Sequence, residues 1–167
     1  MNRVRPALYR VRRSAVHGLG VFAARRIRKG TRIVEYLGER ISHREADRRY
    51  EGKSSRDSHT FLFVVDRSVV IDAGANGIEA RFINHSCEPN CEAVTDERRV
   101  FVEAIRTIQP GEELGYDYAI SRDKEDPPDI DAVFACRCSA EDCRGTMLKP
   151  AVRPRKPQAR GFGRRRP

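Results

Sequence analysis

The sequence predicts a mainly β body with one short helix, flanked by basic segments. Three observations lead to this prediction. Short runs of β-branched and aromatic residues alternate with turn residues along the body. One capping-box pattern indicates where a helix begins. Residues 1–13 hold five Arg and residues 149–167 hold eight Lys or Arg, both without acids, whereas positions 14–148 hold 20 basic and 24 acidic residues, a net charge of −4.

The strands are expected to be short and mostly paired through turns. Asp66-Arg67 is predicted as a tight hairpin turn, Asp96-Glu97-Arg98 as a polar connection, and Gln109-Pro110-Gly111 as a turn that leads into the last strand. The predicted strands cover residues 20–23, 32–37, 60–65, 68–71, 93–95, 100–103 and 114–118.

The helix is predicted from Ser42 to about Tyr50. In Ser42-x-x-Glu45 the hydroxyl accepts a free backbone N–H and the carboxylate returns a bond to the cap. Residues 52–58 are small and polar, which predicts a loop. Pro127-Pro128 indicates a linker over residues 123–131, and the Pro, Arg and Gly content from Lys149 onward predicts disorder.

Length and composition are those of one intracellular domain. A chain of 167 residues suffices for one core. No apolar run approaches a membrane span, and the N-terminus lacks a signal-peptide pattern. We therefore expect a cytoplasmic or chromosome-associated protein. The basic ends are expected either to contact nucleic acid or merely to aid solubility.

The cysteines favour a metal site over disulfides, because five is an odd number. Cys136, Cys138 and Cys143 supply three thiols, one short of a closed tetrahedral zinc site. Cys87, 49 positions upstream of Cys136, is the candidate for the fourth. Cys91 is left over: it packs as a small apolar residue, or it is a reactive thiol or an alternative ligand.

Two further motifs fit together with the cysteines. One is Asn84-His85, within the run from Arg81 to Cys91, and the other is Tyr116-Asp117-Tyr118, which follows Gly111-Glu112-Glu113. Taken alone, each tyrosine would be a packing residue at a strand edge. A zinc that joins Cys87 to the tail would hold the tail across both motifs.

Together these residues resemble the SET-domain protein lysine methyltransferases with a zinc-binding post-SET tail. The resemblance extends from about Ser14 to Met147. It implies small curved sheets with a knot-like C-terminal threading and one short helix in an insert. The implied organisation is a basic arm (1–13), the SET domain (14–121, insert about 40–72), a linker with the post-SET zinc motif (122–148) and a disordered tail (149–167).

The resemblance implies that S-adenosyl-L-methionine is the methyl donor. It assigns donor binding to the His17-Gly18-Leu19-Gly20 loop, to Asn84-His85 and to Tyr36, which also borders the lysine channel. Glycines at the loop allow close approach of the backbone to a ligand. The family also implies Cys87, Cys136, Cys138 and Cys143 as the ligands of one structural zinc ion.

The resemblance further implies the catalytic groups. Tyr118 matches the tyrosine that orients the amine and the departing methyl, and Tyr36 shares the channel. Tyr116 falls at the position that governs how many methyl groups are added, and a tyrosine there implies mono- or dimethylation. Phe134 is the implied lid over the lysine channel, and a body with net charge −4 suits a basic, histone-like or nucleic-acid-associated substrate.

Two positions depart from the family pattern. The usual Thr before Tyr-Asp-Tyr is Gly115, which we expect to loosen the strand that carries both tyrosines. The usual Gly-Asn pair is Gly77-Ile78, which removes the hydrogen bonds of that Asn from the local turn. The chain also begins almost directly at the donor loop, without a cysteine-rich pre-SET segment.

Two other classes of function were weighed against an enzyme. One is a zinc-stapled module without activity that recruits basic proteins or nucleic acid. The other is a nucleic-acid binder whose basic arms are the function, but it leaves the Tyr-x-Tyr and Asn-His motifs unexplained. Retention of three tyrosines and of Asn84-His85 favours the enzyme.

Overall fold

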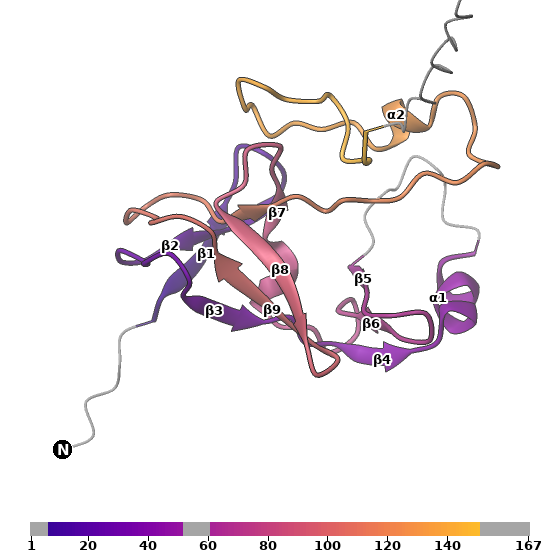
Figure 1. The fold of residues 1–167 in the computed structure, drawn as a ribbon, viewed down its shortest axis with the longest axis horizontal. Helices are drawn as coiled ribbons and strands as arrows, with labels where there is room; N and C mark the ends of the chain where they lie inside the picture. Colours follow the sequence, from indigo (N-terminus) through magenta and orange to yellow (C-terminus); the bar gives the residue numbers. More distant parts are fainter. Residues whose placement is uncertain (1–6, 52–60, 151–167) are drawn as a thin grey trace, which may run out of the picture.

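The structure, a computed structural model, describes residues 7–51 and 61–150. Within these residues the chain forms short strands, two α-helices and one 3-10 helix (Figure 1). The elements are β1 Tyr9–Arg13, β2 Leu19–Ala23, β3 Arg32–Glu35, β4 Glu39–Ile41, α1 His43–Tyr50, β5 Leu62–Val64, β6 Val70–Asp72, η1 Glu79–Phe82, β7 Asn84–His85, β8 Cys91–Asp96, β9 Arg99–Ala104, β10 Gly115–Tyr116 and α2 Ile130–Val133.

The strands form four small sheets, so the predicted mainly β class with small sheets is confirmed. Three sheets are antiparallel and have the strand orders β1-β2, β3-β9-β8 and β4-β6-β5. The fourth is a parallel pair of β7 and β10, which lie 31 positions apart in the sequence. This parallel pair brings the C-terminal part of the body alongside the Asn-His motif.

The β8–β9 and β5–β6 hairpins differ from each other at their turns. β8 and β9 are joined by Glu97-Arg98, whose φ angles of 47° and 62° fit the type I′ turn that matches strand twist. Between β5 and β6, the N–H of Val65 donates to the carbonyl of Val69 at 2.9 Å. The loop is therefore three residues long, and the predicted two-residue turn is wrong.

Helix α1 begins at the predicted cap. The Ser42 hydroxyl accepts from the Glu45 backbone N–H at 3.2 Å. The Glu45 carboxylate, however, accepts from Arg48 and Arg49 rather than returning to the cap. Two cationic side chains within reach are stronger partners than one neutral N–H, so only half of the capping box forms.

The N-terminal segment contributes a strand to the body. Residues 9–13, expected to belong to a basic arm, form β1 and pair with β2 from Tyr9 opposite Ala23 to Arg13 opposite Leu19. Tyr9 and Val11 are half-buried against the core, whereas the arginines between and after them are exposed. Because alternate side chains of a strand point to the same face, two apolar residues are enough to pack this two-stranded ribbon onto the core.

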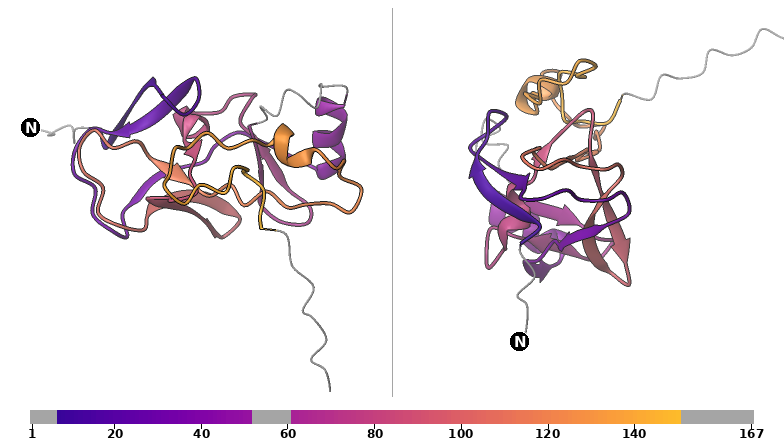
Figure 2. Two further views of the ribbon diagram at one scale, coloured as in Figure 1. Left: turned by 90° about the horizontal axis from the view of Figure 1, so that it is seen from above. Right: turned by 90° about the vertical axis from the view of Figure 1, so that its left-hand side faces the viewer.

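The C-terminal residues form a layer over the β body (Figures 1 and 2). The body has a continuous apolar core around Ile27, Ile83, Ile108 and Leu114, each at most 1% exposed. Residues 119–150 include α2, which begins at the end of the predicted linker, and a parallel bridge between Ile120 and Leu148 joins the two ends of this stretch. The apolar core of the body is thus formed by residues that precede this layer in the chain.

Some predictions lie outside the described residues, namely the loop over 52–58 and the tail from 151 onward. Residues 149–150 are described and lie at the end of the C-terminal layer. In the part of the chain that the structure describes, no helix has the length and apolarity needed to cross a membrane.

Candidate active site and metal centre

The parallel pair β7–β10 joins the two central motifs. Asn84 lies opposite Gly115, and His85 lies opposite Tyr116. Gly115 is buried, and a Cβ there would lie 2.9 Å from the Cβ of Ser86, closer than ordinary packing allows. Its N–H also donates to the side-chain oxygen of Asn90 at 3.0 Å. The expectation of a looser strand is therefore wrong: the missing side chain lets the two strands approach closely.

The three predicted tyrosines surround one buried region. The rings of Tyr116 and Tyr118 lie 4.9 Å apart between centroids. The Tyr118 hydroxyl donates to the Ile83 carbonyl at 2.8 Å, and the Tyr36 hydroxyl donates to the Phe61 carbonyl at 3.2 Å. Burial, with smaller contributions from the other two phenols, raises the pKa of Tyr116. Burial likewise raises the pKa of Tyr118. All three therefore remain neutral at physiological pH.

The glycine loop and Asn84 meet through an unpredicted residue, Glu113. The Asn84 amide donates to the Leu19 carbonyl at 3.0 Å and to the Glu113 carboxylate at 2.7 Å. Glu113 also accepts from the Ser14 hydroxyl at 2.7 Å. Gly20 makes this approach possible, because a Cβ there would collide with the Glu113 carboxylate. The loop, Asn84 and Glu113 thus form one hydrogen-bonded unit.

This unit has more acceptors than donors. Three oxygens face the Asn84 amide, since the His17 carbonyl also lies 3.4 Å away, but an amide has only two N–H bonds. A cationic group with its own N–H donors would fit beside them. An adjoining cavity of about 290 Å³ includes Val16, Asn84, Glu113 and, from the C-terminal layer, Cys138 among its lining residues.

A second hollow is larger but lacks this chemistry. Its volume is about 880 Å³, and it is lined by residues of α1, by both flanking residues and by Leu62 of β5. None of the residues predicted to bind donor, metal or substrate lines it. The smaller cavity is therefore the candidate site, because binding depends on convergent polar groups as well as on volume.

His85 connects the tyrosine strand to the cysteines. Its Nδ1 accepts from the Tyr118 backbone N–H at 3.2 Å, so Nε2 carries the proton. Nε2 lies 3.3 Å from the sulfur of Cys87. Burial is the main reason why the pKa of His85 is lowered. The imidazole is therefore neutral and donates to the sulfur.

The four cysteines predicted as ligands lie together. Their sulfur atoms are all within 4.8 Å of one another, and three of the separations are 3.7, 3.8 and 3.9 Å. A tetrahedral ion with bonds of about 2.3 Å to sulfur requires edges of about 3.8 Å. The cluster therefore fits a four-coordinate metal ion, whereas a disulfide would require about 2.05 Å.

The backbone around the cluster suits thiolates. Each sulfur accepts one backbone N–H at 3.4 Å; the donors are Cys87, Cys138, Arg144 and Gly145. Such bonds stabilise negative charge on metal-bound sulfur. Cys91 lies elsewhere, in β8, where it is 1% exposed, and burial raises the pKa of its thiol to about 12. It packs in the core and is neither an alternative ligand nor a reactive thiol.

An ion pair also ties the cluster to the tyrosines. Arg144 follows the last ligand, Cys143, and its guanidinium donates twice to the Asp117 carboxylate, at 2.8 and 2.9 Å. Asp117 lies between Tyr116 and Tyr118. The tail is therefore fixed to this segment by one charged contact and, through His85, by one neutral contact.

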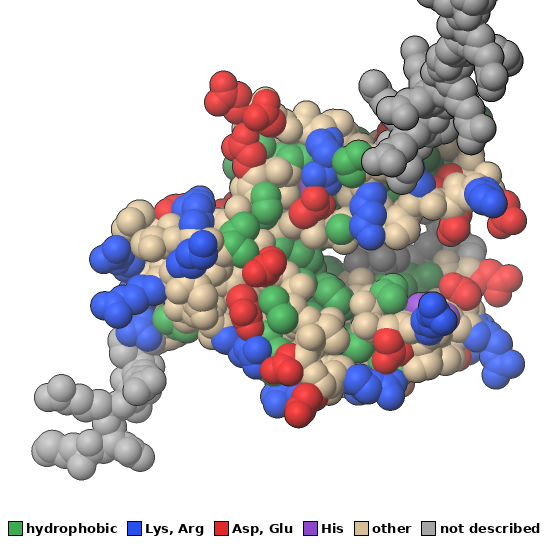
Figure 3. Space-filling view, in the orientation of Figure 1, with side chains coloured by type: hydrophobic (Ala, Val, Ile, Leu, Met, Phe, Trp, Pro, Cys, Tyr) green, Lys and Arg blue, Asp and Glu red, His purple; other side chains and the backbone are tan. Residues whose placement is uncertain are grey.

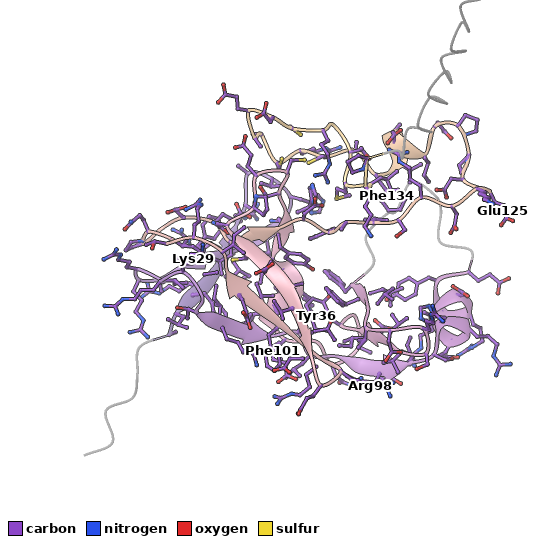
Figure 4. All side chains as sticks on the ribbon, viewed as in Figure 1. Lys29, Tyr36, Arg98, Phe101, Glu125 and Phe134 are labelled. Carbon is purple, nitrogen blue, oxygen red and sulfur yellow. The ribbon has the colours of Figure 1, made fainter. Side chains whose placement is uncertain are left out.

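Phe134 is not brought against the tyrosines. It lies at the end of α2, and its carbonyl accepts from the Met147 N–H at 2.8 Å. Among the described residues its ring makes no aromatic contact with Tyr36, Tyr116 or Tyr118. Figure 4 shows Phe134 in the C-terminal layer and Tyr36 in the body below it. The predicted lid role stays a prediction.

Sequence reasoning assigned no role to four residues that build this site. Ser14, Glu113, Asp117 and Arg144 act through contacts between positions 27 to 99 apart in the chain. Glu113 and Asp117 do lie inside the quoted motifs, and Arg144 follows a predicted ligand. The sequence shows which functional groups these residues carry, but it does not show which residues they contact.

Fold and site together define a β domain with a buried tyrosine cluster and four cysteines whose sulfur atoms could hold a metal ion. The model of the SET domain matches residues 18–119, which is more than half of the chain. The chain belongs to the SET domain family. The C-terminal layer with Cys136, Cys138 and Cys143 lies beyond the matched residues.

Named relatives agree with this family. A histone-lysine N-methyltransferase of Schizosaccharomyces pombe, H3 lysine-4 specific, is 42% identical over 141 residues, which cover 80% of this chain and 14% of the relative. A Saccharomyces cerevisiae protein of the same description is 40% identical, covering 81% and 13%. The histone-lysine N-methyltransferase trr of Drosophila melanogaster is 42% identical, covering 81% and 6%. The chain thus spans a small fraction of these relatives.

Proposed function

We propose that this protein transfers a methyl group from S-adenosyl-L-methionine to the ε-amine of a lysine in a protein substrate. The observation that carries the proposal is the β7–β10 pair. It holds Asn84-His85, which meets the glycine loop, directly beside the buried Tyr116 and Tyr118. The groups proposed to bind the donor and the phenols are therefore held next to each other by the same pair of two-residue strands. The relatives named as histone-lysine methyltransferases support the same activity.

The excess of acceptors around Asn84 supports donor binding. The donor carries an α-ammonium group, which supplies the N–H bonds that the carbonyls of His17 and Leu19 and the Glu113 carboxylate can accept. The adjoining cavity lies at the lower end of the about 300–1,000 Å³ usual for small-molecule sites. Tyr36 and the backbone of His85 complete the donor side.

The buried phenols support the transfer step. A lysine amine has a pKa near ~10.4, so freeing it of its proton at pH 7 costs about 4–5 kcal/mol. Desolvation in an aromatic channel next to a sulfonium favours the neutral amine. The nitrogen lone pair then forms a bond to the methyl carbon while the carbon–sulfur bond breaks and its electrons return to sulfur. The methylated nitrogen bears the positive charge until it loses a proton to solvent.

The tyrosines have separate roles in this proposal. Tyr118 orients the amine and the departing methyl, because its hydroxyl is held by the Ile83 carbonyl beside the parallel pair. Tyr36 borders both donor and lysine. Tyr116 limits the product to mono- or dimethyl-lysine, since its hydroxyl occupies space that a third methyl group would need.

A single zinc ion in the cluster of Cys87, Cys136, Cys138 and Cys143 is part of the proposal. Four thiolates in tetrahedral arrangement are typical of structural zinc. The ion would hold the C-terminal layer over the tyrosines, and it would leave no open position for chemistry. Cys138 also lines the donor cavity, so this layer completes the pocket.

The proposed substrate is a basic, histone-like protein. The residues between the basic ends carry a net charge of −4, which favours Lys- and Arg-rich partners. The relatives named as H3 lysine-4 specific support a histone tail as the first substrate to test.

The test is methyl transfer from labelled S-adenosyl-L-methionine to a panel of basic proteins, with histones included. We expect label on lysine with the wild-type protein and little with Tyr118→Phe. Binding of donor without incorporation into any protein of the panel would instead favour the zinc-stapled module without activity.

A further inference from the structure

The N-terminal part of the body has an unusual charge distribution. The first carboxylate in the chain is Glu35, and ten Lys or Arg residues precede it. Eight of these ten lie within the described residues. Of the eight, Arg32 is paired with Asp96 and Glu103, at 3.1 and 2.8 Å. The other seven make no ion pair with any described residue.

Six of these unpaired cations form what we call the basic face: Arg10, Arg12, Arg25, Arg26, Arg28 and Lys29. All six are exposed. Arg10 and Arg12 lie on one side of β1, with Arg10 directly opposite Phe22 of β2. The other four lie in the loop over residues 24–31 that follows β2. Figure 3 shows Lys and Arg side chains gathered at this end of the molecule, where Figure 4 labels Lys29.

The loop is a fixed scaffold for its charges. Its Ile27 is 1% exposed and exchanges two backbone hydrogen bonds with Ile108, both 2.9 Å long. Ala24 donates to the Leu8 carbonyl at 2.9 Å, and Gly30 donates to the Ala104 carbonyl at 2.7 Å. With Ile27 anchored inward, the cations on both sides of it stay at the surface. The repulsion among them is relieved by no carboxylate within the face.

Cations on the rest of the body are arranged differently. Arg49 bonds Glu39, Glu45 and Asp72, Arg99 pairs with Glu35, and Arg144 pairs with Asp117. Other exposed cations such as Arg67 and Lys124 also make no ion pair with a described residue, but each follows an acidic residue in the sequence. The basic face differs because it gathers six unpaired cations without a carboxylate among them, and these remain available to an external anion. Guanidinium groups bind phosphate oxygens through two parallel N–H bonds.

We propose that the basic face binds the phosphate backbone of duplex DNA without reading its sequence. Duplex DNA carries one charge per about 1.7 Å of axis, which suits a cluster of fixed cations. Single strands are bound by stacking bases on open aromatic rings. The aromatic ring on this face, Phe22, is already covered by the Arg12 guanidinium at 4.2 Å. None of the described helices lies at this face, and its six charged side chains suit contacts to phosphates, which carry no sequence information.

The position of the face is compatible with catalysis. Lys29 and Phe134 lie at well-separated places in Figure 4, and the loop is remote from α1 and the C-terminal layer. DNA bound there would leave the tyrosine cluster open. This inference stands apart from the proposed function, because it requires no methyl transfer.

The test is fluorescence anisotropy of the full chain with a labelled duplex DNA over a range of salt concentrations. The variant replaces Arg25, Arg26, Arg28 and Lys29 by Gln. The matched control replaces four other exposed, unpaired cations by Gln, namely Arg44, Arg67, Lys124 and Lys149. Both variants lose four charges, so their net charge is the same; the control also removes Lys149, one of the eight C-terminal cations, whereas the basic-face variant keeps all eight.

We expect the basic-face variant to bind about 10- to 100-fold more weakly at 0.1 M salt, with the slope of log K against log salt smaller by about three. The control should change both quantities much less. A double variant, Arg26→Gln with Lys29→Gln, should lower the slope by about two and covers the case in which the quadruple variant does not fold. Circular dichroism checks folding.

Three results would overturn the inference. Equal losses in the two quadruple variants would assign binding to net charge or to the chain ends. Equal or tighter binding of single-stranded DNA or duplex RNA would reject duplex DNA as the ligand. Preference for anionic lipid vesicles would make the face a membrane-contact surface instead.

Discussion

The β body and the C-terminal layer are stabilised by different means. In the body, large apolar side chains such as Ile27, Ile108 and Leu114 are fully buried. In residues 119–150, all of which the structure describes, the only buried residues are Thr146 and Leu148. That layer relies on four sulfur atoms, an ion pair and a few backbone bonds. A segment with so little buried apolar surface needs a ligand to be ordered, whereas the body does not.

Metal removal should show the largest difference between the two regions, because it should affect the C-terminal layer and leave the body folded. Structural zinc contributes on the order of 10 kcal/mol to the folding of a small segment. Chelation or Cys138→Ser should therefore abolish methyl transfer and expose residues 119–148 to hydrogen exchange, while the amides of β8 and β9 stay protected. Cys91→Ala is the control, since Cys91 lies outside the cluster. Loss of metal from Cys91→Ala would contradict the ligand assignment.

A core substitution should have the opposite effect: it should destabilise the body and leave the metal bound. Leu114 is fully buried next to the parallel pair, so Leu114→Ala should lower the free energy of unfolding of the body by about 2–5 kcal/mol. Metal content per folded molecule should remain at one ion, as measured by elemental analysis. Leu37→Ala, at an exposed position, should cost little. Release of metal at temperatures where the Leu114→Ala body is still folded would show that the regions are less separate.

Tyr118→Phe tests the chemistry at the junction of the two regions. Removal of a positioned hydroxyl should reduce turnover by about 10²–10³-fold, comparable to the loss of one transition-state hydrogen bond. Donor affinity, measured by calorimetry, should be nearly unchanged. Tyr9→Phe is the control, because Tyr9 lies in β1 and its hydroxyl bonds Glu79 rather than a residue of the site. A parallel loss of donor affinity would place Tyr118 in the donor pocket instead.

The ion pair between the regions should have a smaller effect. Asp117→Asn removes one charge of the pair with Arg144, which is three-quarters buried, and should cost about 1–3 kcal/mol of docking. We expect turnover to fall by roughly tenfold with full metal content. The more exposed pair of Arg122 and Asp131 supplies the control, and Asp131→Asn should change turnover by less than twofold. Equal effects in the two variants would argue against a special role for Arg144.

The smallest expected change is in product rather than in rate. Tyr116→Phe removes one hydroxyl and leaves room for a dimethylated amine to turn toward the sulfonium. Mass spectrometry should detect mono- or dimethyl-lysine from the wild type and more trimethyl-lysine from the variant. The close contact between Gly115 and Ser86 favours a fixed position for this hydroxyl. A wild-type protein that yields mainly trimethyl-lysine would refute the role of Tyr116.

Local patterns predicted local structure well. The cap at Ser42 and the β8–β9 hairpin both follow from short sequence signals. Strand β1 was missed because only Tyr9 and Val11 are apolar among arginines, and their partners lie across a turn. The last strand was expected over 114–118, but its parallel partner β7 offers only two residues.

The sequence predicted many of the residues that form the site, but not the contacts between them. Asn84, Tyr118 and the four cysteines were identified from motifs that resemble a family. Glu113 and Arg144 were not, because a carboxylate or a guanidinium reveals its partner only when folding brings it close. Gly115 had the opposite effect from the one expected, since the consequence of a missing side chain depends on the neighbour that fills the space.

Under the proposed function, the spacing of the four cysteines has a consequence for how activity arises during translation. Cys87 and Cys143 are 56 positions apart. At ribosomal rates of about 5–20 residues per second, the first ligand waits several seconds for the last. During that interval the strands up to β10 can pair, but the donor pocket lacks Cys138. A nascent chain can therefore fold its body and yet remain inert until the final cysteine is released.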